Sequence, residues 1–107
     1  MIVRQWRGWV ARERADDYAA YMAEVAIPAY AGAAGNRGAW MLRRSDGERV
    51  EFCALSIWES IEAVTAFAGG TPDRAVFYAR DDDFLLAREW TVRHYEVSAS
   101  APLNWAE

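Results

Sequence analysis

His94 is the one histidine of this chain and its best candidate for moving a proton near neutral pH. The same 107 residues contain one Cys but 6 Trp, 5 Tyr and 4 Phe. Such scarcity of imidazole and thiol argues against most metal and nucleophile chemistries, whereas aromatic rings supply flat apolar walls. The composition therefore suggests a pocket for a planar apolar molecule, in which His94 could deprotonate a phenol or an enol. The alternative is a structural histidine bonded to a carboxylate or a backbone carbonyl.

Aromatic residues provide the other candidate contacts to such a molecule. Trp58 and Tyr78 are the other candidate catalytic residues. Trp58 could stack on a planar substrate and Tyr78 could donate a hydrogen bond from its phenol, although each could instead pack in the core. The further candidate substrate contacts are Trp6, Phe67 and Phe77. Trp6 and Trp9 face opposite sides of one strand, so they cannot share a wall, and we expect at least one of them to fill an interface.

Three polar features have competing explanations. Arg4 lies within an apolar alternation, where a charge is costly unless it is paired, so it either binds a substrate oxygen or pairs with Glu51 or Glu96. Asn36 could hydrogen-bond a substrate carbonyl, but before Arg-Gly it is first of all a turn residue. The acidic run at 81–83 is expected to be a solvated face, without a metal, because no His or Cys accompanies it.

Composition limits the class of partner. The chain is 53% hydrophobic and 26% charged with a net charge of −4, which is typical of one folded domain and disfavours nucleic acids and anionic membranes. No apolar run approaches the ~20 residues that span a bilayer, and the charged N-terminal segment does not resemble a secretory signal. The unpaired Cys53 fits a reducing compartment, so we expect a cytoplasmic location.

Apolar periodicity divides the chain into one domain over residues 1–98 and a tail over 99–107. Strands are predicted at 1–10, 39–44, 49–58 and 90–97, with amphipathic helices starting near residues 14 and 61. Pro28 should break or kink the first helix, and Thr71-Pro72-Asp73 should start a short third helix that carries Tyr78. In the tail, Leu103 and Trp105 could dock on a surface. The order β-α-β-β-α-β predicts a ferredoxin-like α+β fold: an antiparallel sheet with both helices on one face.

Both faces of the predicted sheet carry apolar side chains, although two helices can cover only one. Residues 39–42 and 52–57 are almost continuously apolar. The second face would be covered most simply by the same face of another copy, so we expect a homodimer packed sheet to sheet. Alternate residues of the strand at 49–58 face opposite sides of the sheet. The sequence leaves open whether the side with Cys53, Leu55 and Ile57 or the side with Phe52, Ala54 and Ser56 contacts the partner.

The segment from Trp58 to Gly69, the closing residues 94–97 and the Asn36-Arg37-Gly38 entry to the hairpin resemble the antibiotic-biosynthesis-monooxygenase superfamily of dimeric α+β barrels. The resemblance covers roughly residues 1–98. It implies a dimeric barrel and a ligand cleft between the sheet and the helices of each protomer. It is specific for the fold but not for the reaction, because the superfamily holds cofactor-independent monooxygenases as well as heme-degrading enzymes.

The resemblance implies, first, a small oxygenase that needs no metal or organic cofactor and oxidises a planar phenolic or enolic substrate with dioxygen. A heme-binding protein with Tyr78 or His94 as ligand is the alternative. The family's heme-ligating His on the short helix and its Asn on the first strand are both missing here. A third hypothesis is a dimer that binds a small apolar metabolite without turnover.

Overall fold

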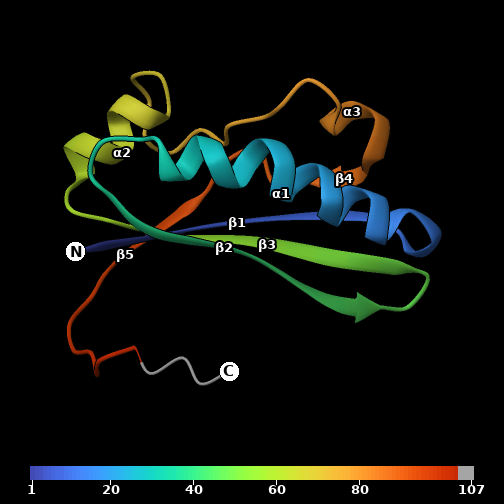
Figure 1. Ribbon diagram of the computed structural model, residues 1–107, viewed down its shortest axis with the longest axis horizontal. Helices are drawn as coiled ribbons and strands as arrows, with labels where there is room; N and C mark the ends of the chain where they lie inside the picture. Colours follow the sequence, from blue (N-terminus) through green and yellow to red (C-terminus); the bar gives the residue numbers. More distant parts are fainter. Residues whose placement is uncertain (104–107) are drawn as a thin grey trace.

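The structure is a computed structural model that describes residues 1–103 of the chain. It consists of one antiparallel sheet covered on one side by helices (Figure 1). The strands are β1 (Ile2–Ala11), β2 (Asn36–Asp46), β3 (Arg49–Trp58), β4 (Leu85–Arg88) and β5 (Arg93–Glu96). The helices are α1 (Ala15–Ala31), α2 (Ile61–Phe67) and α3 (Asp81–Phe84), with a 3-10 turn at Arg12–Arg14.

The order of the strands across the sheet confirms the predicted ferredoxin-like fold. The order is β2-β3-β1-β4, and β5 also pairs with β1. Local signals account for the central elements: Gly47, with a positive φ of 65°, turns the hairpin between β2 and β3, and the Ser60 side chain accepts a hydrogen bond from the Ala63 N–H to begin α2.

The last predicted strand, 90–97, is shorter than expected, because only β5 (Arg93–Glu96) forms within it, and a strand that was not predicted, β4 (Leu85–Arg88), pairs with the same edge of β1. Between them the chain leaves β1 and bonds to the segment that follows α2. Ala75 N–H donates to Trp90 O at 3.1 Å, and Val92 N–H donates to Asp73 O at 2.9 Å. The backbone groups that bond to residues 90–92 are not available for hydrogen bonds within a helix. The predicted third helix at Thr71-Pro72-Asp73 therefore does not form.

The first helix differs less from its prediction. It continues through Pro28 to Ala31 instead of breaking there, and Gly32 N–H donates back to Pro28 O at 2.9 Å. Pro28 lies in the last turns of the helix and on its exposed side, where one missing hydrogen bond is tolerated.

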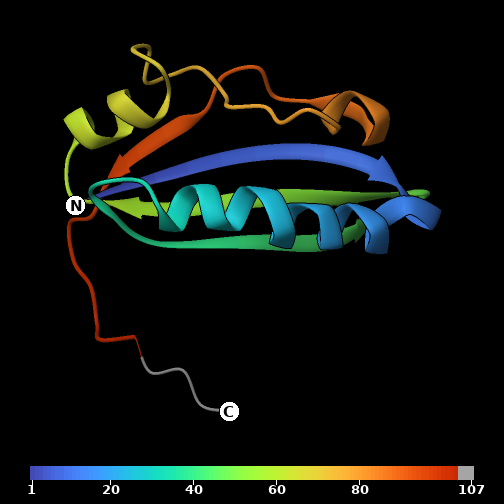
Figure 2. The same cartoon turned by 45° about the horizontal axis from the view of Figure 1, so that its top comes forward.

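The helices bury one face of the sheet and leave the other open. On β3, Phe52, Ala54 and Trp58 are buried beneath the helices, while Leu55 and Ile57 point to the opposite face and are half-exposed. Figure 1 shows α1 and α2 above the sheet and residues 97–103 leaving below it. In Figure 2, with the top turned forward, α1 lies over β2 and β3 and α2 lies near β5. Leu103 in that segment is exposed, and the predicted contact of Trp105 lies outside the described residues.

Apolar and charged side chains share the open face. Val3, Trp40, Leu42, Leu55, Ile57 and Tyr95 follow the strand register across it. Beside them Arg7 and Arg93 both bind the Glu89 carboxylate, with shortest N–O distances of 2.9 Å. Burial alone would raise the pKa of Glu89, but the hydrogen bonds from Arg93 and Arg7 outweigh it and hold that pKa at about 2. In no described helix is there an apolar stretch long enough to cross a membrane.

Candidate functional site

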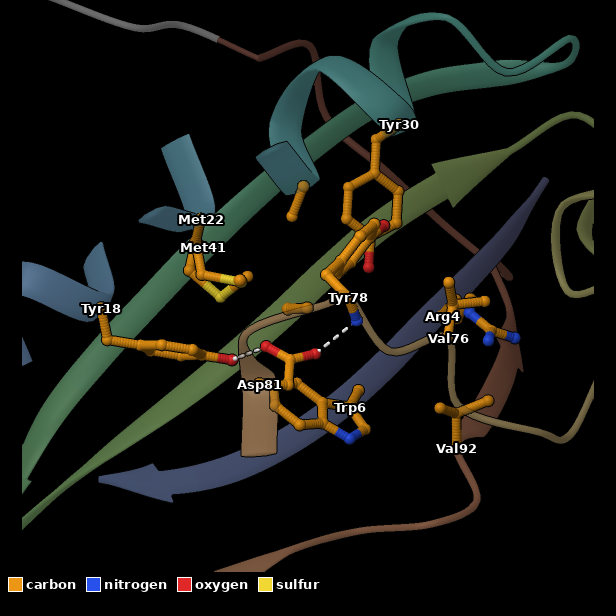
Figure 3. A pocket seen from close by; sticks show the side chains of 12 residues that line it. Arg4, Trp6, Tyr18, Met22, Tyr30, Met41, Val76, Tyr78, Asp81 and Val92 are labelled. Carbon is orange, nitrogen blue, oxygen red and sulfur yellow. Dashed lines mark hydrogen bonds between the residues drawn. The ribbon is translucent and has the colours of Figure 1, made fainter. Parts of the chain in front are cut away.

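A cavity lies between α1, the helix-covered face of the sheet and the segments that flank α3. Its volume is about 20 Å³, room for about one water molecule. The lining residues are Arg4, Trp6, Tyr18, Met22, Ala26, Tyr30, Met41, Ala54, Val76, Tyr78, Asp81 and Val92. Three phenols, an indole and two thioethers therefore surround one cationic and one acidic group, as Figure 3 shows.

Three of the side chains predicted to contact a ligand line this cavity: Arg4, Trp6 and Tyr78. The sheet places the first two, because positions 4 and 6 of β1 both face the helices. Trp6 is held there by its Nε1–H, which donates to Glu89 O at 2.7 Å, and by the edge of Phe77 at a centroid distance of 6.2 Å. Trp9 lies on the other face of β1, as predicted.

Arg4 is only 3% exposed and has no carboxylate partner within residues 1–103, so the expected pairing with Glu51 or Glu96 is wrong. Its NH1 donates to Pro72 O at 2.6 Å and its NH2 to Arg74 O at 2.7 Å. Burial lowers the pKa of Arg4, but a guanidinium remains charged at any ordinary pH. This cation therefore anchors the segment after α2 to β1 and leaves a positive charge in the cavity wall.

His94 does not line the cavity, so of the two roles that the sequence left open for it, a general base or a structural histidine, its position favours the second. It lies behind Arg4, whose NH1 is 3.0 Å from the His94 Nε2. Arginine has no acceptor atom, so Nε2 must accept and the ring proton must sit on Nδ1, 3.5 Å from Asp73 Oδ1. The lone pair that a general base would use is therefore already engaged.

Burial, and then the charge of Arg4, lower the pKa of His94. The unfolded chain therefore takes up a proton at a higher pH than the folded chain does. Stability is unaffected by His94 above its unfolded pKa of ~6.5 and falls as the pH drops below that value. We expect urea unfolding to show this loss of stability. A His94→Gln variant, whose amide oxygen can still accept from Arg4, should not show it. An equal acid-side loss in both proteins would mean that His94 is not responsible.

The remaining predicted site residues have other surroundings. Trp58 is 0% exposed: its Nε1–H donates to Ser56 Oγ at 2.8 Å, and its ring packs against Phe67 at a centroid distance of 4.9 Å. Asn36 Oδ1 accepts from Gly38 N–H at 3.0 Å, the turn role that was the alternative. Phe77 contacts Trp6 and Trp90 rather than the cavity.

Asp81 is the acidic member of the cavity, and the prediction that the whole acidic run is a solvated face is wrong at this position. It is 2% exposed. Its Oδ1 accepts from Tyr18 OH at 3.2 Å and its Oδ2 from Tyr78 N–H at 2.7 Å (Figure 3). Burial raises the pKa of Asp81, although the hydrogen bonds from Tyr78 and Tyr18 oppose that shift.

The Tyr78 hydroxyl is buried without a hydrogen-bond partner among the described residues. Such a group usually costs ~1–3 kcal/mol, so its persistence in a cavity wall invites a ligand acceptor. Burial raises the pKa of Tyr78 and raises that of Tyr30 to about 12, so both phenols stay protonated and can donate.

An open groove adjoins the cavity. It has a volume of about 470 Å³ and lies between α1 and β2, lined by Ala19, Ala23, Ile27, Ala39, Trp40, Met41, Arg43 and Phe52. Met41 lines both the groove and the cavity, so the two are adjacent at this side chain. A methionine has three rotatable bonds and a polarizable thioether, which makes it an adaptable side chain.

Comparison with known proteins extends the description of the fold. No protein-family model and no curated protein matches the chain. Among solved structures, the heme-degrader MhuD from Mycobacterium tuberculosis, with two hemes bound in its active site, is 22% identical with a TM-score of 0.67, over 95% of this chain and 100% of that one.

Two further structures share the architecture. Rv0793 from Mycobacterium tuberculosis is 18% identical with a TM-score of 0.55 and is covered in full, as is this chain. A NIPSNAP domain protein from Burkholderia xenovorans is 14% identical with a TM-score of 0.59, over 95% of this chain and 99% of that one. These likenesses confirm the ferredoxin-like fold that the resemblance to the antibiotic-biosynthesis-monooxygenase superfamily implied.

Proposed function

We propose that the chain binds a planar enol or phenol in the cavity beneath α1 and oxidises it with dioxygen without a cofactor. The observation that carries this proposal is the Tyr78 hydroxyl, buried and unpartnered among aromatic and thioether side chains. A phenol, enol or ketone oxygen would supply the acceptor that this donor lacks. Arg4 adds a fixed positive charge, which would stabilise the same oxygen once it became anionic.

The reaction starts with removal of a proton from an acidic carbon or hydroxyl of the substrate. The carbanion formed from an anthrone-like methylene gives one electron to dioxygen, and the resulting radical and superoxide combine into a peroxide. Protonation and loss of water then leave a carbonyl, so one oxygen atom enters the product and the other leaves as water. The chain's own part is to orient the ring, exclude water and stabilise the oxyanion.

Ligand entry requires the cavity to enlarge, since ligand pockets commonly hold ~300–1,000 Å³. Rotation of the Met41 side chain would join the cavity to the open groove that it borders. Sheet and helices could then remain in place, which suits a site whose donors are held by β1 and by the backbone bonds of the 72–75 segment.

Oxygen uptake with anthrone and a panel of hydroquinones, in the presence of a chelator, tests this proposal. We expect turnover by the wild type and a decrease of roughly 10²-fold in kcat for Tyr78→Phe. This variant is a clean test because the lost hydroxyl makes no hydrogen bond to residues 1–103, so its free energy of unfolding should not fall. No uptake with any compound, or equal rates for both proteins, would contradict the proposal.

Heme binding is a second candidate because a solved structure with this fold, MhuD, holds two hemes in its active site. Tyr78 is the residue that would ligate the iron, since its hydroxyl has no partner in the described part of the chain. The present arrangement fits a heme poorly: His94 is engaged by Arg4, and a heme, being larger than anthrone, would need the cavity to enlarge further than the proposed substrate does. Titration with hemin separates the candidates, because a Soret shift at micromolar protein would favour heme and no shift would favour the oxygenase.

A dimer is also part of the proposal. We propose that two copies pack through their open sheet faces, as the resemblance implies. The face carries both apolar side chains and the mixed charges of Arg7, Glu89 and Arg93, so a two-fold axis can set unlike charges against each other.

A further inference from the structure

We propose that Asp81 is the general base of this site, the group that takes the proton from the substrate carbon or hydroxyl. The inference rests on the proposed function, but it assigns the proton transfer to a residue that belongs to none of the sequence-based candidates. His94, the sequence-based candidate, lies outside the cavity with its lone pair held by Arg4.

Asp81 has the geometry of a base that is available. Its carboxylate lines the cavity and, in the part of the chain that the structure describes, has no arginine within ion-pair distance, whereas its neighbours Asp82 and Asp83 contact Arg88 and Arg80. Among the described residues it accepts from Tyr18 OH and from Tyr78 N–H alone. A carboxylate has about four acceptor positions on its two oxygens, so lone pairs remain for a proton.

Two contacts fix the position of the carboxylate. The Tyr78 N–H bond ties Asp81 to the backbone immediately before α3, and the Tyr18 hydroxyl reaches it from α1. The same tyrosine that donates its N–H to the base presents its free hydroxyl to the cavity. One short segment thus provides both the proton acceptor and the donor that would stabilise the resulting oxyanion.

The step balances within the site. The substrate C–H or O–H bond breaks, the proton forms an O–H bond with the Asp81 carboxylate, and the electron pair moves onto the substrate oxygen. Tyr78 and Arg4 stabilise that oxygen. Burial favours the neutral form of Asp81, so accepting a proton relieves the desolvation of its charge and makes it a stronger base than an exposed aspartate.

An anaerobic exchange experiment isolates this step from the reaction with oxygen. Anthrone is incubated with the protein in heavy water, and the loss of its methylene proton signal is followed by NMR. We expect the wild type to catalyse this exchange and Asp81→Asn to lose it by roughly 10²–10⁴-fold. Asparagine has nearly the same shape and can still accept from Tyr78 N–H, so the fold should survive, as circular dichroism would show.

A second variant separates a base from a purely structural residue. Tyr18 and Tyr78 affect the pKa of Asp81 through hydrogen bonds. Two charged groups also affect it: Arg88 of β4 lowers this pKa and Asp82 of α3 raises it. Tyr18→Phe removes a hydrogen bond that holds the pKa of Asp81 down. We therefore expect exchange to persist, with its acid-side decline displaced to higher pH.

The outcomes distinguish the two claims. Catalysed exchange that Asp81→Asn leaves unchanged would overturn the assignment of Asp81 while the proposed function stands. Catalysed exchange without oxygen uptake in air would overturn the proposed oxygenase while Asp81 remains the base. Absence of exchange by the wild type, or an unmoved acid decline in Tyr18→Phe, would overturn the assignment of Asp81.

Discussion

Leu55→Lys is expected to separate the proposed dimer into folded monomers. Leu55 lies near the middle of β3 on the open face, opposite Gln5 of β1 and Trp40 of β2. In a sheet-to-sheet dimer its side chain is buried, and an unpaired ammonium there costs several kcal/mol. The dimer Kd should therefore rise by roughly 100-fold or more, measured by sedimentation equilibrium at micromolar concentration.

Ala54→Lys is the matched control, because Ala54 is adjacent in sequence but faces the helices. It is buried in the cavity wall beneath α1. A lysine there should unfold the chain rather than dissociate it, as circular dichroism would show. A wild type that sediments as a monomer, or a Leu55→Lys variant that remains a dimer, would contradict the sheet-to-sheet arrangement.

Trp58→Ala is expected to cost ~3–5 kcal/mol of the free energy of unfolding, a large part of the stability of a domain of this size. Trp58 is fully buried and packs against Phe67 and Tyr30, with centroid distances of 4.9 and 6.4 Å. Its removal leaves a large cavity and an unpaired Ser56 hydroxyl. Urea unfolding at one fixed protein concentration measures the loss, since a dimer makes stability depend on concentration.

Trp58→Phe keeps the aromatic packing and removes the hydrogen bond to Ser56 Oγ, so it should lose only ~1 kcal/mol. Because Trp58 does not line the cavity, this variant should oxidise anthrone at nearly the wild-type rate. If Trp58→Phe remained stable but lost ligand binding, Trp58 would belong to the site rather than to the core.

Elements with strong local signals could be predicted from the sequence. The Asp46-Gly47 turn and the apolar run at 49–58 located the central hairpin, and Ser60 with Gly69-Gly70 located α2. At these positions the turn residues, the helix cap and the apolar periodicity all indicate the same element, and the tertiary contacts of the fold agree with that local preference.

Elements that depend on distant partners could not be predicted. The short helix expected after Thr71-Pro72-Asp73 is replaced by irregular chain with one isolated bridge from Arg74 to Thr91, because Arg4 and the 90–92 segment take its backbone groups. The same pairing takes residues 90–92 away from β1, so the last strand is only Arg93–Glu96. No sequence pattern within residues 71–78 indicates that their backbone carbonyls bind Arg4 of β1.

The residues of the cavity also fall into those that the sequence could predict and those that only the fold brings together. Arg4 and Trp6 could be predicted because strand alternation puts them on one face, but their partners come from elsewhere. Asp81 carries no signal that separates it from Asp82 and Asp83; only the fold places it against Tyr18. Tyr18 and Met22, one turn apart on α1, were visible in the sequence as an apolar stripe and hence as core.

The central claim is that a planar ligand occupies the cavity beneath α1, and the methionines report on it directly. The chain has three, of which Met22 and Met41 line the cavity while Met1 is exposed at the start of β1. In protein labelled with 13C at the methionine methyl groups, NMR titration with anthrone under anaerobic conditions should shift the Met22 and Met41 signals and leave Met1 in place. Unchanged Met22 and Met41 signals at saturating ligand would contradict the account.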